Sequence, residues 1–98
     1  MIVLISDDAE IDLADGVAFY DRHGPEIGDH FCDSLLADVQ SLSVVGGVHA
    51  KRFGYYCMAA KRFPYGIYYT IDETAVFIVA ILDERRDLAW IQRRLNRG

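Results

Sequence analysis

Three of the four pairs of adjacent cations in the second half of the sequence are the residues that we expect to bind phosphate groups. Lysine and arginine neutralise a phosphate and stabilise charge that develops on it, although binding a phosphate is not the same as cleaving it. We expect these cations, together with one tyrosine and the tryptophan, to contact a macromolecular target or partner. The expected contact residues are Lys51, Arg52, Lys61, Arg62, Tyr68, Arg85, Arg86 and Trp90.

Two interpretations of Lys61 and Arg62 remain open, because both precede the apolar run PYGIYYTI (64–71). They are either a polar pair at the start of a strand, of the kind that discourages edge-to-edge pairing, or part of a charged working face. Arg86 has the acids Asp83 and Asp87 close to it in sequence. We favour an ion pair that fixes the C-terminal segment over a cation that contacts the target, because close carboxylates usually restrain a guanidinium.

The sequence gives little support for metal, cofactor or nucleophile chemistry. His23, His30 and His49 do not stand at metal-ligand spacing, so we expect neither a metal nor a cofactor. Cys32 and Cys57 form no CxxC pair, and we expect small buried hydrophobes in a reducing compartment. Neither a G-x-S-x-G turn nor a phosphate-binding GK[ST] loop is present.

Length and charge suggest one acidic domain with two different surfaces. The 98 residues, 52% of them hydrophobic, are enough for a single domain over 1–98. Residues 1–48 hold one cation and ten acids, a balance of −9, while residues 49–98 hold nine cations and five acids, a balance of +4. The overall charge of −5 argues against a general nucleic-acid coat protein. The start, MIVLIS, lacks the length and basic flank of a signal peptide, so we expect a cytosolic protein.

The first half of the chain predicts a strand followed by two helices. IVLIS (2–6) is a short β-branched run, and Asp7 is the expected cap of the helix that follows. Gly24 and Pro25 separate this helix from the next. The acids of both helices, Asp12 and Asp38 among them, are expected to face outward. The apolar stripes are Ala9, Leu13, Val17 and Tyr20 on the first helix, and Ile27, Phe31, Leu35, Val39 and Leu42 on the second.

The second half predicts three strands and a closing helix. The runs are YYCMAA (55–60), PYGIYYTI (64–71) and AVFIVAIL (75–82), and LAWIQRRLNRG (88–98) is amphipathic, with Leu88, Ile91 and Leu95 inward and its arginines outward. The expected fold is α+β, β-α-α-β-β-β-α, with a twisted, mainly antiparallel four-stranded sheet and a helical hairpin on one face. Alternation places Tyr65, Ile67 and Tyr69 on one face of the sheet and Gly66 and Tyr68 on the other. The face away from the hairpin is expected to work on a target or to be covered by a partner or second copy.

Three stretches of the chain together resemble the RelE/ParE superfamily of bacterial toxins from type II toxin–antitoxin modules. They are AEIDLADGVAFYDRHGPEIGDHF (9–31), KRFPYGIYY (61–69) and DERRDLAWIQRRL (83–95). The resemblance is to the branch known as plasmid stabilisation proteins, and it covers nearly the whole chain in the right order. It implies this same fold in a small cytosolic toxin that an antitoxin, encoded beside it, neutralises with an extended or helical tail.

Members of the superfamily that the chain resembles have one of two activities. RelE-like members are ribosome-dependent endonucleases that cleave mRNA, whereas ParE-like members poison DNA gyrase. Nuclease members commonly carry an arginine after the tyrosine of the central strand, where this chain has Gly66, and often a tyrosine where it has Trp90. An indole cannot replace a phenol as an acid. We therefore favour a ParE-like toxin that binds a target such as gyrase and is not an enzyme.

Two alternatives stay open. An mRNA endonuclease would have Lys61, Arg62, Arg85 and Arg86 as its catalytic candidates. A non-toxic interaction protein of the same fold would account for the negative net charge, because toxins of this family are commonly basic. The expected partners are a cognate antitoxin, gyrase or the ribosome with its mRNA, and no membrane. The small size of the chain also favours association, with an antitoxin or as a homodimer.

Overall fold

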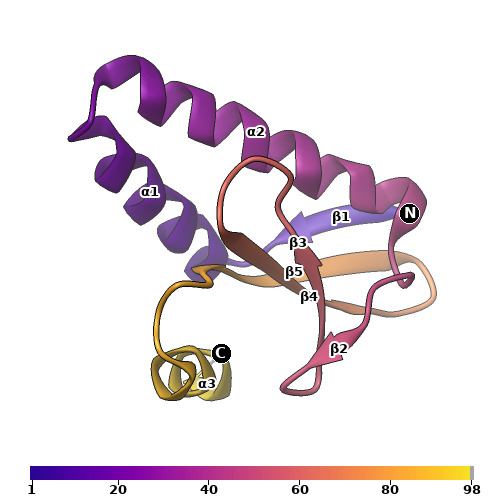
Figure 1. Cartoon of the computed structure of the whole chain (residues 1–98). Coiled ribbons are helices and arrows are strands. Elements are labelled where there is room, and N and C mark those ends of the chain that lie inside the picture. The colour runs from indigo at the N-terminus through magenta and orange to yellow at the C-terminus, as the bar shows by residue number, and fades with distance from the viewer. Residues whose placement is uncertain (98) are drawn as a thin grey trace.

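The computed structural model describes residues 1–97, which form three helices and five strands (Figure 1). In chain order these are β1 (Ile2–Ile5), α1 (Asp7–Asp21), α2 (Pro25–Val45), β2 (Lys51–Arg52), β3 (Tyr55–Ala59), β4 (Tyr65–Ile71), β5 (Ala75–Asp83) and α3 (Leu88–Arg97). The expected α+β class and element order are confirmed, with one additional strand, β2.

The five strands form one mixed sheet in the order β1-β5-β4-β3-β2. β1 runs parallel to β5, while the other neighbours are antiparallel. The additional strand β2 exists because Phe53 and Gly54 form a two-residue turn with φ of 54° and 86°. Positive φ at both positions is the geometry of a tight hairpin. The sequence does not predict this turn, because a bulky residue such as Phe53 rarely adopts a positive φ.

Helices α1 and α2 form the expected hairpin on one face of the sheet (Figure 1). The side chain of Ser6, not that of Asp7, caps α1, because its hydroxyl accepts a hydrogen bond from the backbone N–H of Ala9 at 3.1 Å. Gly24, with φ of 143°, precedes Pro25 at the first position of α2. A residue with free φ followed by one with fixed φ sets the sharp change of direction between the two helices.

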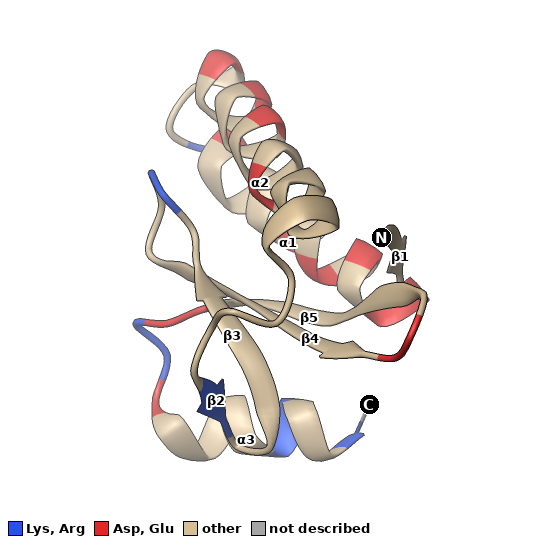
Figure 2. Cartoon of the chain, turned by 90° about the vertical axis from the view of Figure 1, so that its right-hand side faces the viewer, with Lys and Arg blue, Asp and Glu red and all other residues tan. Residues whose placement is uncertain are grey.

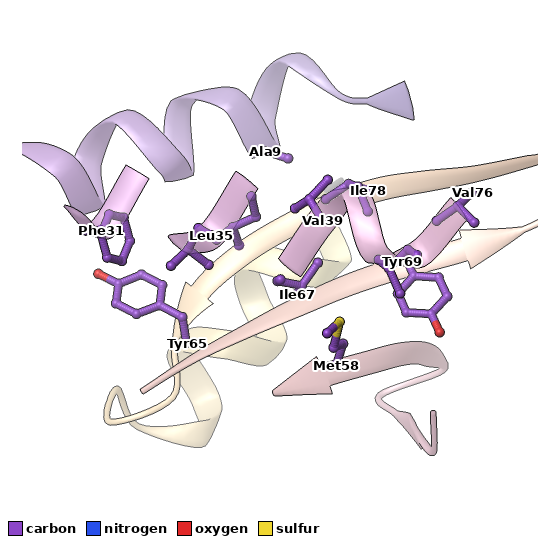
Figure 3. Close-up of a cluster of buried hydrophobic side chains, with 12 residues drawn as sticks. Ala9, Phe31, Leu35, Val39, Met58, Tyr65, Ile67, Tyr69, Val76 and Ile78 are labelled. Atoms are coloured by element: carbon purple, nitrogen blue, oxygen red, sulfur yellow. The ribbon is translucent and has the colours of Figure 1, made fainter. Parts of the chain in front are cut away.

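The main hydrophobic core lies between this hairpin and the sheet (Figure 3). Gly16 lets α1 approach α2 closely, since a Cβ at this position would lie 2.5 Å from the ring of Phe31 on α2. As predicted, one face of β4 points into this core. Its fully buried members include Phe31, Leu35 and Leu42 from α2, Ile67 and Tyr69 from β4, and Val76 and Ile78 from β5.

The other face of the sheet is not left open, because α3 packs on it (Figures 1 and 2). A second core forms there from Tyr68, Ala80, Leu82, Ile91 and Leu95. The expectation of a free second face is therefore wrong where α3 lies. The predicted orientation of α3 is also wrong at two positions, since Leu88 is 59% exposed and Arg94 is buried.

Candidate functional site

The six cations among the expected contact residues lie in three separate parts of the chain (Figure 2), while Tyr68 lies in β4 and Trp90 in α3. Residues 51–52 form the edge strand β2, residues 61–62 lie in the loop between β3 and β4, and residues 85–86 follow β5. Lys61 and Arg62 line a cavity of about 250 Å³ against α2, whereas Arg86 lines a different cavity of about 280 Å³. The structure does not bring the four catalytic candidates into one cavity.

The loop that carries Lys61 and Arg62 reaches up to α2 instead of staying at the margin of the sheet (Figure 2). Asp38 holds it there, because its Oδ2 accepts the backbone N–H of Lys61 at 3.0 Å. Asp38 was predicted to face outward, but it is only 4% exposed. Both cationic side chains are exposed. Lys61 and Arg62 therefore remain available to a partner, next to the acid Asp33, which lines the same cavity.

The ion pair expected for Arg86 is made by Arg85 instead. Arg85 donates through Nε and Nη2 to the two carboxylate oxygens of Asp83, at 3.0 and 2.8 Å. The guanidinium of Arg86 lies over the ring of Trp90, 4.1 Å from its centroid. Asp87 instead accepts the backbone N–H of Trp90 at 2.8 Å and so caps the start of α3. The prediction that Arg86 forms an ion pair was wrong, because adjacent arginines point in different directions where the chain leaves a strand.

The Asp83–Arg85 pair predicts a stability difference that depends on pH. Hydrogen bonds from Arg85 hold the pKa of Asp83 below its usual value of 3.8. Ionised Asp83 therefore stabilises the folded state at neutral pH, and this contribution is lost as pH falls below 3.8 toward the lower folded pKa. We expect Asp83→Asn to be less stable than the parent at pH 7, with the difference shrinking in strong acid.

Thermal melts at several pH values measure this difference. Glu73→Gln, in the exposed turn before β5, is the matched control and should track the parent throughout. A gap between Asp83→Asn and the parent that stays constant from neutral to strongly acidic pH would contradict the assignment.

Tyr68 lies in a polar cluster on the face of the sheet that α3 covers, and it is not available to a partner. It is fully buried, and its hydroxyl donates to Oε1 of Glu84 at 2.9 Å. Arg52 donates to the same oxygen at 3.1 Å, and the thiol of Cys57 lies 3.5 Å from it. Burial raises the pKa of the Tyr68 hydroxyl. Burial, with the nearby charge of Glu84, also raises the pKa of Cys57 to about 11, so neither group is a ready acid or nucleophile at neutral pH.

The glycine at position 66 is required by this same cluster. A Cβ on Gly66 would collide with the carboxylate of Glu84 and lie 3.1 Å from the sulfur of Cys57. Glu84 therefore occupies the space into which a longer side chain at position 66 would project. An arginine at this position would have to displace Glu84 from Tyr68 and Arg52.

A buried ion pair, which the sequence did not predict, joins α1 to α3 where β1 ends. Arg94 donates to both carboxylate oxygens of Asp12, at 3.2 and 2.7 Å. β1 pairs with β5 only as far as Ile78. Beyond that point the side chains of Asp12 and Arg94 make hydrogen bonds to the backbone of β5. Asp12 accepts the N–H of Ile81 at 3.1 Å, and Arg94 donates to the carbonyl of Val79 at 3.4 Å. Burial raises the pKa of Asp12, although the bonds from Ile81 and Arg94 oppose this shift.

An apolar groove of about 510 Å³ runs along the helical hairpin beside β1. β1 is an edge strand of the sheet, and the side chains of Ile2 and Leu4 on it are 62% and 46% exposed. An open apolar groove next to an unpaired strand edge is a common docking site for a peptide segment. The groove is lined by Ile5, Glu10, Leu13, Ala14, Val17, Cys32 and Leu36.

The histidines lie apart in the fold. Nδ1 of His49 is 2.6 Å from the hydroxyl of Tyr69, Nδ1 of His23 is 3.3 Å from a backbone carbonyl of α1, and His30 packs near a phenylalanine ring. Among residues 1–97, no group of three histidine, cysteine or acidic side chains is placed to hold a metal ion. Within the same residues, no helix combines the length and apolar character that crossing a bilayer requires.

Comparisons with known proteins find a similar fold among solved structures. No protein-family model matches the sequence, and no curated protein does either. Among solved structures, the fold is similar to a chain from the chromosomal ParDE TA system from P. aeruginosa, with a TM-score of 0.74 and 21% identity. The match covers 83% of this chain and 92% of that chain. The chain therefore has a RelE/ParE-like fold, as its sequence resemblance implied.

Proposed function

We propose that this protein is the toxin of a type II toxin–antitoxin module. It acts in the ParE-like manner, by binding a target such as DNA gyrase, and a cognate antitoxin neutralises it. The observation that carries the proposal is the likeness in fold to a chain of a ParDE toxin–antitoxin system, over 83% of this chain and 92% of that one. The separation of the charged residues supports action by binding over action by catalysis.

The groove beside β1 is the proposed antitoxin-binding surface. An apolar helix or extended segment of the antitoxin would fill it, and the free edge of β1 could accept backbone hydrogen bonds from an added strand. Ala14 is exposed within this groove. A partner that fills the groove would remove exposed apolar surface from water, which is the main driving force for such association.

The geometry disfavours the nuclease alternative. Cleavage of RNA needs a base, an acid and cations that converge on one phosphate. Lys61 and Arg62 line one cavity, Arg86 lines another, and Arg85 is paired with Asp83. The position expected to carry an arginine in nucleases is Gly66, and Glu84 fills the space beside it.

The proposal is tested with purified protein and purified gyrase. We expect the protein to inhibit DNA supercoiling, or to stabilise cleaved DNA complexes, at concentrations comparable to those of the enzyme. Induced expression in a bacterial host should arrest growth, and co-expression of the neighbouring antitoxin gene should relieve the arrest. Absence of any effect on gyrase at high protein concentration would remove gyrase as the target.

The same assays separate the alternatives. Growth arrest without gyrase inhibition, accompanied by codon-position-specific mRNA cuts that disappear in Arg86→Ala, would favour the nuclease. Normal growth after strong induction of folded protein would favour a non-toxic interaction protein, which the net charge of −5 keeps under consideration.

A further inference from the structure

A small cavity on α3 is lined almost entirely by arginine side chains. It has a volume of about 240 Å³, and the residues that line it are Trp90, Arg93, Arg94 and Arg97. These positions recur at helical spacing of three and four residues, so they share one side of α3. No acid is among the described residues that line the cavity. The helix dipole favours cations in this last turn, but it does not require three guanidinium groups around one cavity.

Arg94 is the buried residue in the lining of this cavity, and Asp12 holds its side chain in place. Its side chain is only 5% exposed, and Asp12 engages its Nε and Nη2. The remaining nitrogen, Nη1, is buried and has no hydrogen-bond partner among residues 1–97. A buried N–H donor that lacks an acceptor costs free energy, so an acceptor brought to Arg94 would be favoured.

The charge balance of the cavity is positive. Asp12 offsets one guanidinium, that of Arg94. Arg93 and Arg97 are exposed and make no ion pair among residues 1–97. Arg97 also borders the adjoining cavity, whose lining includes the acids Asp12, Asp15 and Asp83. Arg86 adds a further cation nearby, because it stacks on the ring of Trp90 at 4.1 Å. Like charges four residues apart on a helix repel each other, and a bound anion would relieve this repulsion.

We propose that this cavity is a carboxylate-binding site, which accepts an acidic side chain from a segment of a partner protein. Its volume of about 240 Å³ is below the roughly 300–1,000 Å³ of pockets for larger ligands and suits one side chain. Arginine pairs with carboxylates through two parallel hydrogen bonds, as Arg94 already does with Asp12. The indole of Trp90 offers apolar surface to the methylene groups of the incoming side chain.

A nucleic-acid backbone suits the same site less well. Binding to nucleic acid depends on neutralising several phosphates along a strand, and only Arg93 and Arg97 present free exposed charge at this cavity. The carboxylate site does not depend on the toxin activity proposed above, so the two are tested independently.

Trp90 provides the readout, because it is the only tryptophan in the chain. We expect a hexaglutamate peptide, titrated into the full chain at low ionic strength, to change the emission of Trp90 in a saturable way. Replacing Arg93 and Arg97 together by glutamine should weaken this binding about tenfold or more, since it removes both free charges. The matched control replaces Lys61 and Arg62 by glutamine, which removes the same charge elsewhere and should leave binding unchanged.

Three outcomes would overturn the proposal. The first is an emission change that does not saturate. The second is an equal loss of binding in the two double variants, which would indicate attraction by net charge alone. The third is tighter binding of a single-stranded DNA hexamer than of hexaglutamate with the same dependence on Arg93 and Arg97, which would assign the site to nucleic acid. Circular dichroism checks that each variant is folded before it is titrated.

Discussion

An Arg94→Met variant is expected to lose about 3–5 kcal/mol of its free energy of unfolding, the usual cost of removing one partner from a buried ion pair. Methionine retains much of the apolar volume of the arginine but leaves the carboxylate of Asp12 without its cation. This loss is costly because the side chain of Asp12 is only 10% exposed. It also removes the bond to the Val79 carbonyl. Small domains have roughly 5–15 kcal/mol in total, so urea unfolding should show a large decrease in midpoint.

Two further variants make this result interpretable. Arg93→Met changes the neighbouring, exposed arginine and should alter stability by no more than about 0.5 kcal/mol. Asp12→Asn combined with Arg94→Met should recover part of the loss, because no buried charge then remains unpaired. If Arg94→Met does not fold, the double variant still gives a measurable midpoint. A double variant less stable than Arg94→Met, or a loss below about 1 kcal/mol in Arg94→Met, would contradict the assigned role of the pair.

On the proposed function, an Ala14→Glu variant is expected to remain toxic but to escape its antitoxin, with binding weakened by about 100-fold. Ala14 is exposed in the apolar groove beside β1, so the substitution should leave the fold intact. A partner that fills the groove would bury the new carboxylate without a cation, which costs several kcal/mol. A hundredfold change corresponds to about 2.8 kcal/mol. Growth during co-expression with the antitoxin, and calorimetric titration of the purified pair, measure the effect.

Ala18→Glu is the control for this prediction. Ala18 is another exposed alanine of α1, four residues further along, and it does not line the groove. It should be neutralised as well as the parent. Equal antitoxin affinity for the two variants would place the antitoxin elsewhere on the surface, whereas loss of toxicity in both would point to α1 as part of the target-binding surface.

Local sequence patterns were sufficient to predict most of the architecture. The apolar stripe of α2 from Phe31 to Leu42 and the alternation on β4 each follow from a periodicity that one element must satisfy alone. Ile27, the predicted first member of that stripe, is 38% exposed. Gly24 and Pro25 likewise marked the break between the helices. These features depend on neighbours within a few residues, so a single sequence contains them.

The features that the sequence did not predict depend on distant residues. Arg94 looks like a solvated cation until Asp12 is placed beside it, and 82 residues separate the two. β2 depends on an uncommon φ at Phe53. The ion pair expected of Arg86 is made by Arg85, because the contacts of each arginine depend on the direction of the chain after β5. Pattern alone therefore identified the cations but not which of them were paired.

The parallel pairing of β1 with β5 also constrains how this chain is made. Translation produces Ile2–Ile5 more than seventy residues before their partners, Ala75–Ile78. Contacts between such distant segments form slowly, because the loop that joins them must first be closed. β1 therefore stays unpaired while the ribosome makes α1, α2 and the strands up to β5. Any activity that needs the complete sheet is withheld from the nascent polypeptide until β5 has been synthesised.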